Sequence, residues 1–105
     1  MSGMRGDIFE VEAEVWTWRL PNHQGIWHFL TVDGQTSAEM RYAALGRTGG
    51  FGSIKVTATI GRTRWRTSVF PHREAGGFIL PIKAEVRRRE DIGPGSVVTV
   101  QLAVE

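Results

Sequence analysis

Hydrophobic and polar residues alternate along much of the chain, a period-two pattern that is typical of β-strands with one buried face. The strand expected over residues 8–18 has an apolar face made of Phe9, Val11, Ala13 and Val15. Its other face carries three glutamates followed by two tryptophans, namely Glu10, Glu12, Glu14, Trp16 and Trp18. A second strand is expected over residues 26–32, and because both of its faces are apolar it is expected inside a barrel or under a helix.

The clearest supersecondary motif is a β-hairpin over residues 52–70. With a two-residue loop at positions 61–62, small Ala58 pairs with Trp65 on the core face and leaves room for its ring. The same register pairs Ile60 with Thr63, Val56 with Thr67 and Ile54 with Val69. It also places four polar or basic side chains together on the opposite face, which are Lys55, Arg64, Arg66 and Ser68.

The first of two expected helices begins at TSAE, where Thr36 and Glu39 have the spacing of a capping box. Apolar residues follow at helical spacing, and Gly46 is a natural stop. The pattern therefore predicts one short helix between the second strand and the hairpin.

The second helix is expected over residues 82–90, with Pro81 suited to its start. A short strand at residues 76–81 precedes it, and GPGS after it is typical of a type II turn. The last strand, over residues 96–104, has an inward face of Val98, Val100, Leu102 and Val104. The whole pattern predicts an all-β fold, a small closed or double-split β-barrel of six to seven strands with two short helices.

Length and composition narrow the class of protein. A chain of 105 residues fits a single domain, expected here over residues 1–105 with a flexible N-terminus at residues 1–6. The absence of cysteine excludes disulfides, a thiolate nucleophile and a cysteine-based zinc site. No signal-peptide pattern and no apolar run of membrane-spanning length occur, so we expect a cytoplasmic protein that does not contact membranes.

Charge is distributed unevenly along the chain. The net charge is +2, yet residues 47–89 hold ten basic and two acidic side chains. A segment this basic attracts anions, including phosphates, whereas arginines on the outer faces of strands also serve simply to solvate them. Charge alone leaves these two interpretations open.

Basic side chains are the best candidates for binding chemistry. Lys83 and Arg87 stand four residues apart and so share a helix face. Guanidinium and ammonium groups bind carboxylate and phosphate well, and together with Arg64 and Arg66 they are expected to form an anion-attracting surface. The alternative for Arg87 is structural, with the side chain paired to a neighbouring carboxylate or a buried carbonyl to hold the helix on the barrel.

Aromatic side chains and histidines form a second set of candidates. Trp65 is expected in the core, and Trp27 is expected to line a cavity. Trp16 falls on the glutamate face, so either a bulge turns it inward or it serves a contact surface or a pocket mouth. His72 lies in a loop and is a candidate to line a site, whereas His28 is expected to be a hydrogen-bonded core histidine.

Stronger catalytic motifs are absent. The glycine-rich residues 46–53 lie between a helix and a strand, which is the reverse of a phosphate loop, and they lack its Gly-Lys-Ser/Thr ending. The histidines lack metal-ligand spacing, so no metal site is expected. Ser68 and His72 are separated by a turn, and a GxSxG motif is missing. The three glutamates are expected to be solvated and ionised.

Five blocks in order resemble the bacterial family known as domain of unknown function 1905; they are Trp27, GGFGSIKV, TRWRTSVFP, FILPIKAEVR and GPGSVVTVQL. The resemblance covers nearly the whole chain, residues 8–103. It implies a fold similar to the double-split β-barrels and no established reaction.

A second resemblance is local. Residues 80–100 are similar to the second half of the swapped-hairpin transcription factors and antitoxins of the AbrB and MazE kind, on a pattern that includes Pro81, Lys83, Val86, Arg87, Gly95, Val98 and Val100. Ser96 stands where an aspartate is more usual, so any role of that carboxylate is absent. Those proteins bind DNA through a barrel built by two chains, whereas this longer chain is expected to complete the barrel alone.

The combined prediction is a non-enzymatic binding module for a small anionic ligand or a protein partner, without cofactor or metal, as a monomer or homodimer. The expected ligand-binding residues are Lys55, Arg64, Arg66, Ser68, Lys83, Arg87, His72, Trp16 and Trp27. The first alternative is nucleic-acid binding by the basic hairpin face, against which the three glutamates count if they share that face. The second is a barrel enzyme with Lys83, His72 or Tyr42 as general acid or base, which a deep cavity around a desolvated Lys83 favours and a filled core contradicts.

Overall fold

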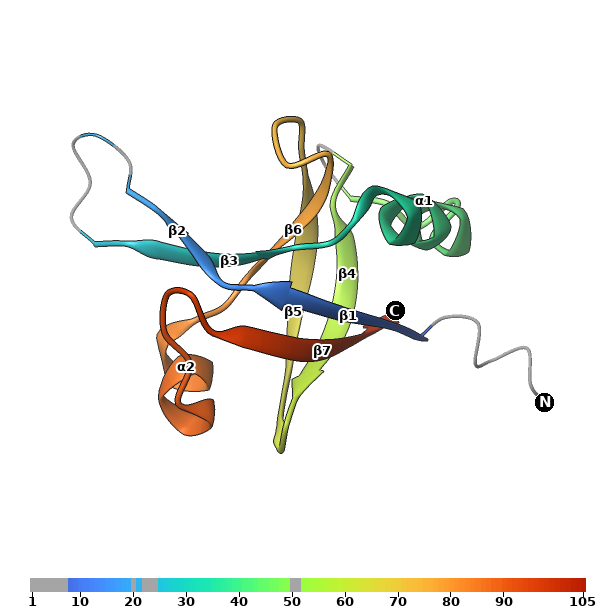
Figure 1. Ribbon diagram of the computed structural model, residues 1–105. Helices are drawn as coiled ribbons and strands as arrows, with labels where there is room; N and C mark the ends of the chain where they lie inside the picture. Colours follow the sequence, from blue (N-terminus) through green and yellow to red (C-terminus); the bar gives the residue numbers. More distant parts are fainter. Residues whose placement is uncertain (1–7, 20, 22–24, 50–51) are drawn as a thin grey trace.

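The computed structural model of the protein describes residues 8–19, 21, 25–49 and 52–105. The elements in these residues are β1 (Ile8–Glu14), β2 (Trp16–Trp18), β3 (Trp27–Thr31), α1 (Gly34–Ala43), β4 (Ile54–Ile60), β5 (Thr63–His72), β6 (Gly77–Pro81), α2 (Ala84–Glu90) and β7 (Val97–Val104) (Figure 1). The flexible segment expected at residues 1–6 lies outside the described residues, as do His23 and residues 50–51 of the glycine-rich stretch.

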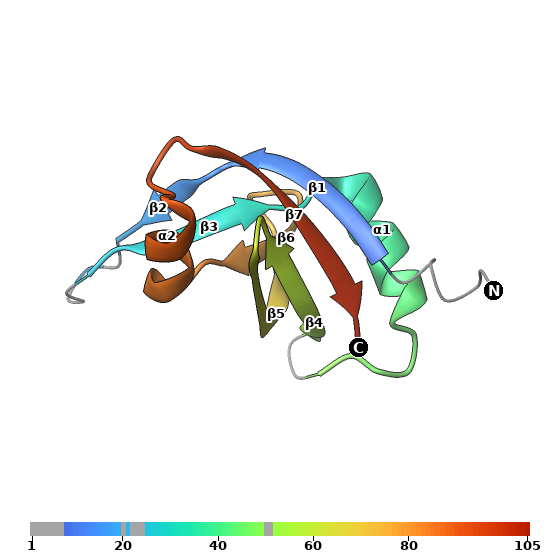
Figure 2. The ribbon, with the colours of Figure 1, turned by 90° about the horizontal axis from the view of Figure 1, so that it is seen from below.

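All these strands belong to one antiparallel sheet in the order β1-β7-β4-β5-β6-β3-β2. The strands at its two edges, β1 and β2, are consecutive in the chain and are separated only by Val15. Because one covalent link joins both edges, the sheet curls round, and Figure 2 shows β1 and β7 arching across the molecule. The predicted small all-β barrel with two helices is confirmed.

The single strand expected over residues 8–18 is wrong in one respect, because it is interrupted at Val15. The backbone N–H of Val15 donates to the Ser96 carbonyl at 2.8 Å, and its carbonyl accepts from the N–H of Gly95 at 2.9 Å. These bonds to the turn before β7 bend the chain while the Val15 side chain enters the core. As a result β1 pairs with β7, whereas β2 pairs with β3.

One hydrophobic core fills the barrel. Alternate residues of β4 and β7 pack inside it, among them the fully buried Val56 and Leu102. The two helices lie at opposite ends of the molecule in Figure 1, and they add Met40 and Val86 to the same core. Trp65 is only 8% exposed and belongs to this core, as the sequence predicts.

The β4–β5 hairpin has the predicted register, since Ala58 pairs with Trp65 and Ile60 with Thr63. Gly61 has a φ of +57°, which the first central position of a two-residue loop of type II′ requires. The register puts Lys55, Arg64, Arg66 and Ser68 on the outer face of the sheet, as expected.

The helix start expected at Thr36 is wrong. The N-cap of α1 is Asp33, whose Oδ2 accepts a hydrogen bond from the Thr36 backbone N–H at 3.0 Å. An aspartate at this position satisfies the amide three residues on and suits the positive end of the helix. The hydrogen bond from the Thr36 amide is the main reason that the pKa of the Asp33 carboxyl lies below its ordinary value.

Ser37 ties α1 to the sheet. Its fully buried hydroxyl donates to the Val32 carbonyl at 3.1 Å and accepts from the Phe78 backbone N–H at 3.0 Å. Gly77 allows this close approach, because a Cβ at that position would lie only 2.6 Å from the Ser37 Oγ.

Pro81 is the last residue of β6, as the strand expected over residues 76–81 predicts, but the helix expected over residues 82–90 begins two residues later. α2 begins at Ala84, and Lys83 occupies its N-cap position without a side-chain capping bond. The type II turn at residues 93–96 is confirmed by the φ of +86° at Gly95 and by the 3.0 Å hydrogen bond from the Ser96 N–H to the Gly93 carbonyl.

Candidate functional site

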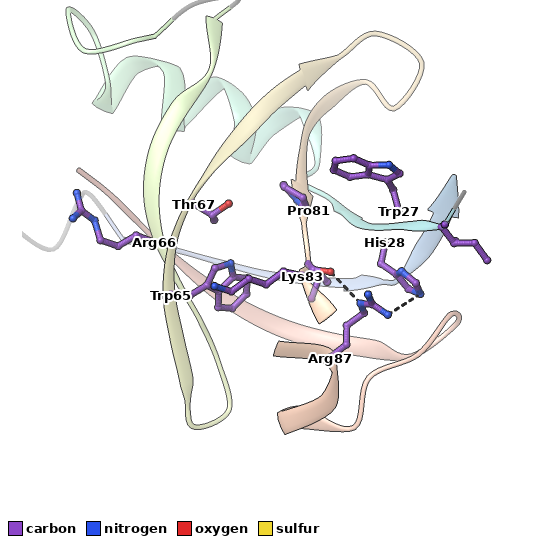
Figure 3. Close-up of a pocket in the computed structure, with 11 residues that line it drawn as sticks. Trp27, His28, Trp65, Arg66, Thr67, Pro81, Lys83 and Arg87 are labelled. Atoms are coloured by element: carbon purple, nitrogen blue, oxygen red, sulfur yellow. Dashed lines mark hydrogen bonds between the residues drawn. The ribbon is translucent and has the colours of Figure 1, made fainter. Parts of the chain in front are cut away.

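A cleft opens where β5 separates from β6. β5 pairs with β4 through residues 63–69 but with β6 only through residues 70–72. Continuing the β5–β6 register places Pro81 opposite Ser68, and Pro81 has no N–H to donate, so the ladder ends there. Beyond this point lies a cleft of about 370 Å³ between β5, the start of β3 and the β6–α2 connection (Figure 3).

The cleft has apolar walls and a cationic opening. Trp65 and Ile82 are buried in its floor, whereas Trp27 is 52% exposed at its rim. Figure 3 shows Trp65 and the neighbouring residues of β5 on one side, and Trp27, His28 and Arg87 on the other. A site of this composition fits a ligand with a flat apolar part and a negative charge.

Arg87 is held in the cleft by neutral groups. Its Nε donates to the Ile82 carbonyl at 3.1 Å, and its Nη1 lies 3.4 Å from Nε2 of His28. These contacts engage two of the five guanidinium N–H groups. Within the described ranges of the chain no carboxylate forms an ion pair with Arg87. Of the two structural partners expected for Arg87, a carboxylate or a buried carbonyl, the structure shows the carbonyl, that of Ile82. The half-buried positive charge is therefore held in place without being neutralised.

His28 remains neutral beside Arg87. The pKa of its ring lies below the ordinary value of 6.5, chiefly because burial disfavours the charged form and also because Arg87 is positive, while the backbone of Ile26 acts in the opposite sense. A neutral ring accepts at Nε2 from Arg87 and carries its proton on Nδ1. Nδ1 has no hydrogen-bond partner in the part of the chain that the structure describes. The prediction that His28 is hydrogen-bonded is thus confirmed for Nε2 but not for Nδ1.

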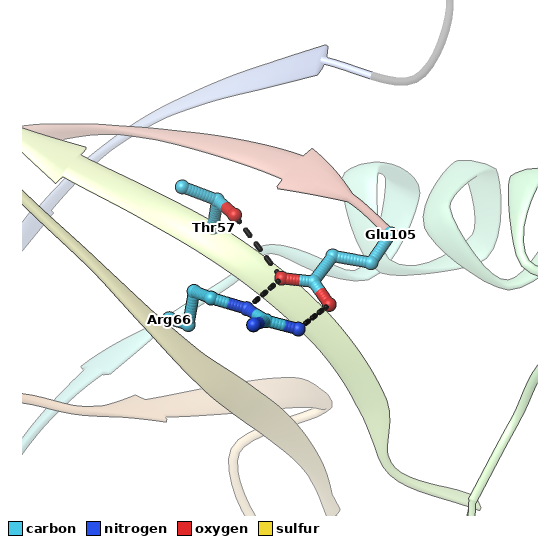
Figure 4. Close-up of polar contacts among 3 residues, drawn as sticks. All are labelled: Thr57, Arg66 and Glu105. Atoms are coloured by element: carbon cyan, nitrogen blue, oxygen red, sulfur yellow. Dashed lines mark hydrogen bonds and ion pairs between the residues drawn. The ribbon is translucent and has the colours of Figure 1, made fainter.

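Arg66 stands at the outer rim in an ion pair with Glu105 (Figure 4). Its Nε and Nη2 each donate to a carboxylate oxygen at 2.9 Å, and the Thr57 hydroxyl donates to the same carboxylate at 3.1 Å. The hydrogen bond between the two side chains is the main reason that the pKa of Glu105 is lowered and that of Arg66 is raised. The Arg66 side chain is 79% exposed, so water screens the pair, and an anion entering the cleft competes with Glu105 for the guanidinium.

A second hollow of about 520 Å³ continues the cleft along β5. It shares Trp27, Arg66 and Pro81 with the first cleft and adds Lys55 and Ser68. The structure thus brings together six of the nine predicted site residues, which are Lys55, Arg66, Ser68, Lys83, Arg87 and Trp27.

Two of the predicted residues lie elsewhere, in an aromatic group around β2. The His72 ring is 5.9 Å from the ring of Trp16 and 5.9 Å from that of Trp18, measured between centroids. Trp16 also packs against Phe29 and donates from Nε1 to the Thr31 hydroxyl at 2.8 Å. Trp16 is therefore engaged within the sheet, and the bend at Val15 places it beside β3.

Arg64 lines neither hollow and lies exposed on the outer face of the hairpin. The strand pairings run across this face from Glu10 through Gln101 and Thr59 to Arg64. With strands about 4.8 Å apart, the acidic strand β1 lies roughly 14 Å from β5 on the same face. The glutamates of β1 therefore share the face that nucleic acid would have to approach.

Sequence reasoning missed the part that His28, Ile82 and Thr67 play in the cleft. His28 and Ile82 were expected to face the core, and they do so at the point where the core opens. The only available signal was Pro81, because a proline that cannot donate to a neighbouring strand marks the end of a ladder.

The arrangement lacks the features expected of the enzyme alternative. Lys83 is exposed at the mouth of the cleft, and the barrel interior is filled by hydrophobic side chains. Tyr42 is 79% exposed on α1. In the described ranges no group of three metal-ligating side chains occurs, and no helix there is long and apolar enough to cross a membrane.

A family model described as a domain of unknown function, DUF1905, matches residues 12–102. The chain belongs to this family. The DUF1905 match confirms the resemblance indicated by the five sequence blocks, and its description names no ligand and no reaction. No curated protein matches the chain. The likeness to swapped-hairpin proteins stays a prediction.

Proposed function

We propose that this DUF1905 domain is a non-catalytic binding module whose cleft takes a small anionic ligand with a flat apolar part. The observation that carries the proposal is Arg87, which is half-buried, oriented by Ile82 and His28, and without a carboxylate partner in the described chain. Charged groups that leave water are normally paired in proteins. An anion seated against Arg87 supplies that partner.

The surroundings of Arg87 support the same ligand class. Lys83 and Arg66 add positive charge at the mouth and the rim, where they attract an anion from solution. Trp27 and Trp65 offer aromatic surface inside the same cleft, which favours a planar group on the ligand. Lys83 is exposed, and His28 uses its Nε2 atom to hold Arg87, so binding without catalysis is the simplest use of the site.

The location of the site is tested by a titration with benzoate, a flat carboxylate, followed through the indole N–H resonances of the four tryptophans. Benzoate is expected to shift the resonances of Trp27 and Trp65, because they line the cleft. Trp16 and Trp18 line neither hollow, so their indole resonances are expected to shift less, even though Trp18 pairs with Trp27 across the strands and Phe29 contacts both Trp16 and Trp27. Shifts confined to Trp16 and Trp18, or no shift at millimolar benzoate, would contradict the proposal.

A parallel titration with a short duplex and a short single-stranded oligonucleotide at low salt tests the alternative function. We expect weak binding or none, because the glutamates of β1 share the outer face with the basic hairpin. Strong binding that falls steeply with salt and is lost in Arg64→Ala would instead place nucleic acid on the hairpin face.

A further inference from the structure

β5 presents an unpaired backbone edge along the cleft. In a two-residue hairpin the residues that flank the loop form a hydrogen-bonded pair, and such pairs recur at every second residue. Trp65 and Thr67 therefore direct their N–H and C=O groups toward β4. Arg64 and Arg66 direct theirs to the opposite side, away from β4 and toward the cleft.

No strand of the described chain pairs with β5 on that side at these two residues. β6 pairs with β5 only at residues 70–72, and within the described ranges no other backbone hydrogen bond reaches the N–H and C=O groups of Arg64 and Arg66. α2 covers only the beginning of the edge, where the Thr63 hydroxyl donates to Glu90 at 2.6 Å. The edge is consequently open between the end of α2 and the point where β6 joins.

We propose that this edge binds an extended acidic segment of a partner protein, which adds as a strand beside β5. The proposal rests on the proposed function, since the carboxylates of the segment are the anions that the cleft receives. Side chains of an added strand point alternately to the two faces of the sheet. Those on the outer face meet Arg64 and Arg66, and those on the inner face reach toward Arg87.

Charge complementarity decides in favour of an acidic occupant. Five cations surround the edge, namely Lys55, Arg64, Arg66, Lys83 and Arg87. Among the described residues only Arg66 of these five forms an ion pair with a carboxylate. Cations along an edge oppose its pairing with a second copy of the same edge, because like charges repel. They favour a strand that carries glutamate or aspartate.

The length of the opening suits a short segment. On the side of the cleft β5 has no strand partner from Arg64 to Val69, because its first pair with β6 is at Phe70. An extended chain advances about 3.4 Å per residue, so this stretch accommodates roughly six residues of an added strand.

Amide hydrogen exchange with a blocked hexapeptide of alternating glutamate and threonine tests the proposal. The peptide is expected to slow exchange at Arg64 and Arg66 by about tenfold or more, because these amides gain acceptors. The amides of Trp65 and Thr67 change little, since β4 already bonds them. A peptide of alternating lysine and threonine is the matched control and gives no protection; equal protection by both peptides would overturn the role of charge.

Backbone pairing is tested separately with two N-methylated forms of the acidic peptide, methylated at alternate residues in the two registers. Only one set of amides faces β5 in an added strand, so one form is expected to lose about tenfold in affinity while the other binds as before. Equal affinities for the two forms would show that the peptide does not add as a strand.

The two proposals fail in different ways. If benzoate shifts Trp27 and Trp65 but the acidic peptide leaves exchange at Arg64 and Arg66 unchanged, the strand proposal is overturned and the anion site stands. If neither benzoate nor the peptide binds, both are overturned.

Discussion

Arg87 has two roles that depend on the same contacts. Its bond to the Ile82 carbonyl fastens the start of α2 to the sheet, and its contact with His28 orients the guanidinium toward the cleft. The spacing of Lys83 and Arg87 is visible in the sequence. The contact with His28 is not, because it joins residues 59 positions apart that only the closure of the barrel brings together.

His28 makes stability depend on pH in a defined window. Because the pKa of His28 is lowered in the folded protein, the unfolded chain binds a proton below about pH 6.5 that the folded chain does not bind. The free energy of unfolding therefore falls as the pH drops from about 6.5 toward the folded pKa. His28→Gln is expected to remove this part of the pH dependence, measured by urea unfolding at about pH 7.5 and 5.5. An identical pH dependence in wild type and variant would contradict this account of the ring.

In the proposed anion site, Glu105 would compete with the ligand for Arg66. Glu105→Gln keeps the shape of the side chain but removes the charge that holds the Arg66 guanidinium. We expect the affinity for benzoate to rise about threefold, as is typical for the release of an exposed ion pair. Glu85→Gln is the control, since it breaks the exposed Arg89–Glu85 pair outside the cleft and leaves the affinity unchanged. Weaker binding in Glu105→Gln would show that Arg66 does not face the ligand.

Among the elements, the β4–β5 hairpin is the one that sequence predicts most completely. Its alternation and its glycine loop are local signals, and they set the register that later places Arg66 at the cleft. The break at Val15 is different, because it depends on hydrogen bonds to the distant turn before β7. The cap at Asp33 is different as well, because it required a choice between two possible capping residues, Asp33 and Thr36. Local pattern does not contain that information.

The attachment of α1 to the sheet depends on one buried hydroxyl. Ser37→Ala leaves the backbone N–H of Phe78 without its acceptor inside the protein. We expect a loss of about 1–3 kcal/mol in the free energy of unfolding, measured by urea denaturation. Ser68→Ala, at a half-buried position on the outer face, is expected to change stability by less than about 0.5 kcal/mol. Equal stabilities of the two variants would refute this role for Ser37.

At the scale of the whole molecule, the barrel separates acidic and basic regions. β1 carries its glutamates at one side of the outer face, while β5 and the start of α2 bring the cations to the cleft. The uneven charge along the sequence predicts this separation in outline. The cleft itself follows from where β5 and β6 part, and that point is set by three-dimensional pairing rather than by composition.

The candidate site was predictable as a set of residue types but not as a shape. Six of the nine expected residues meet in the two hollows, because the hairpin register and the helix spacing each group them correctly. His72 and Trp16 lie outside the cleft for different reasons. β5 continues through Pro71 to His72, where a turn and a loop were expected, and the bend at Val15 puts β2 on the far side of β3. The distances between such segments can be read only from the folded, closed sheet and not from the sequence.

The affinity of the wild-type protein and of Arg87→Gln for benzoate tests the central claim most directly, with Arg88→Gln as the matched control on the same helix. We expect Arg87→Gln to weaken binding about tenfold or more, because a charged hydrogen bond to the ligand is lost, and Arg88→Gln to bind as the wild type does. Lys83→Gln, an exposed change that leaves α2 attached, is expected to weaken binding about threefold. Equal affinities in the wild type, Arg87→Gln and Lys83→Gln would contradict an anion site in this cleft.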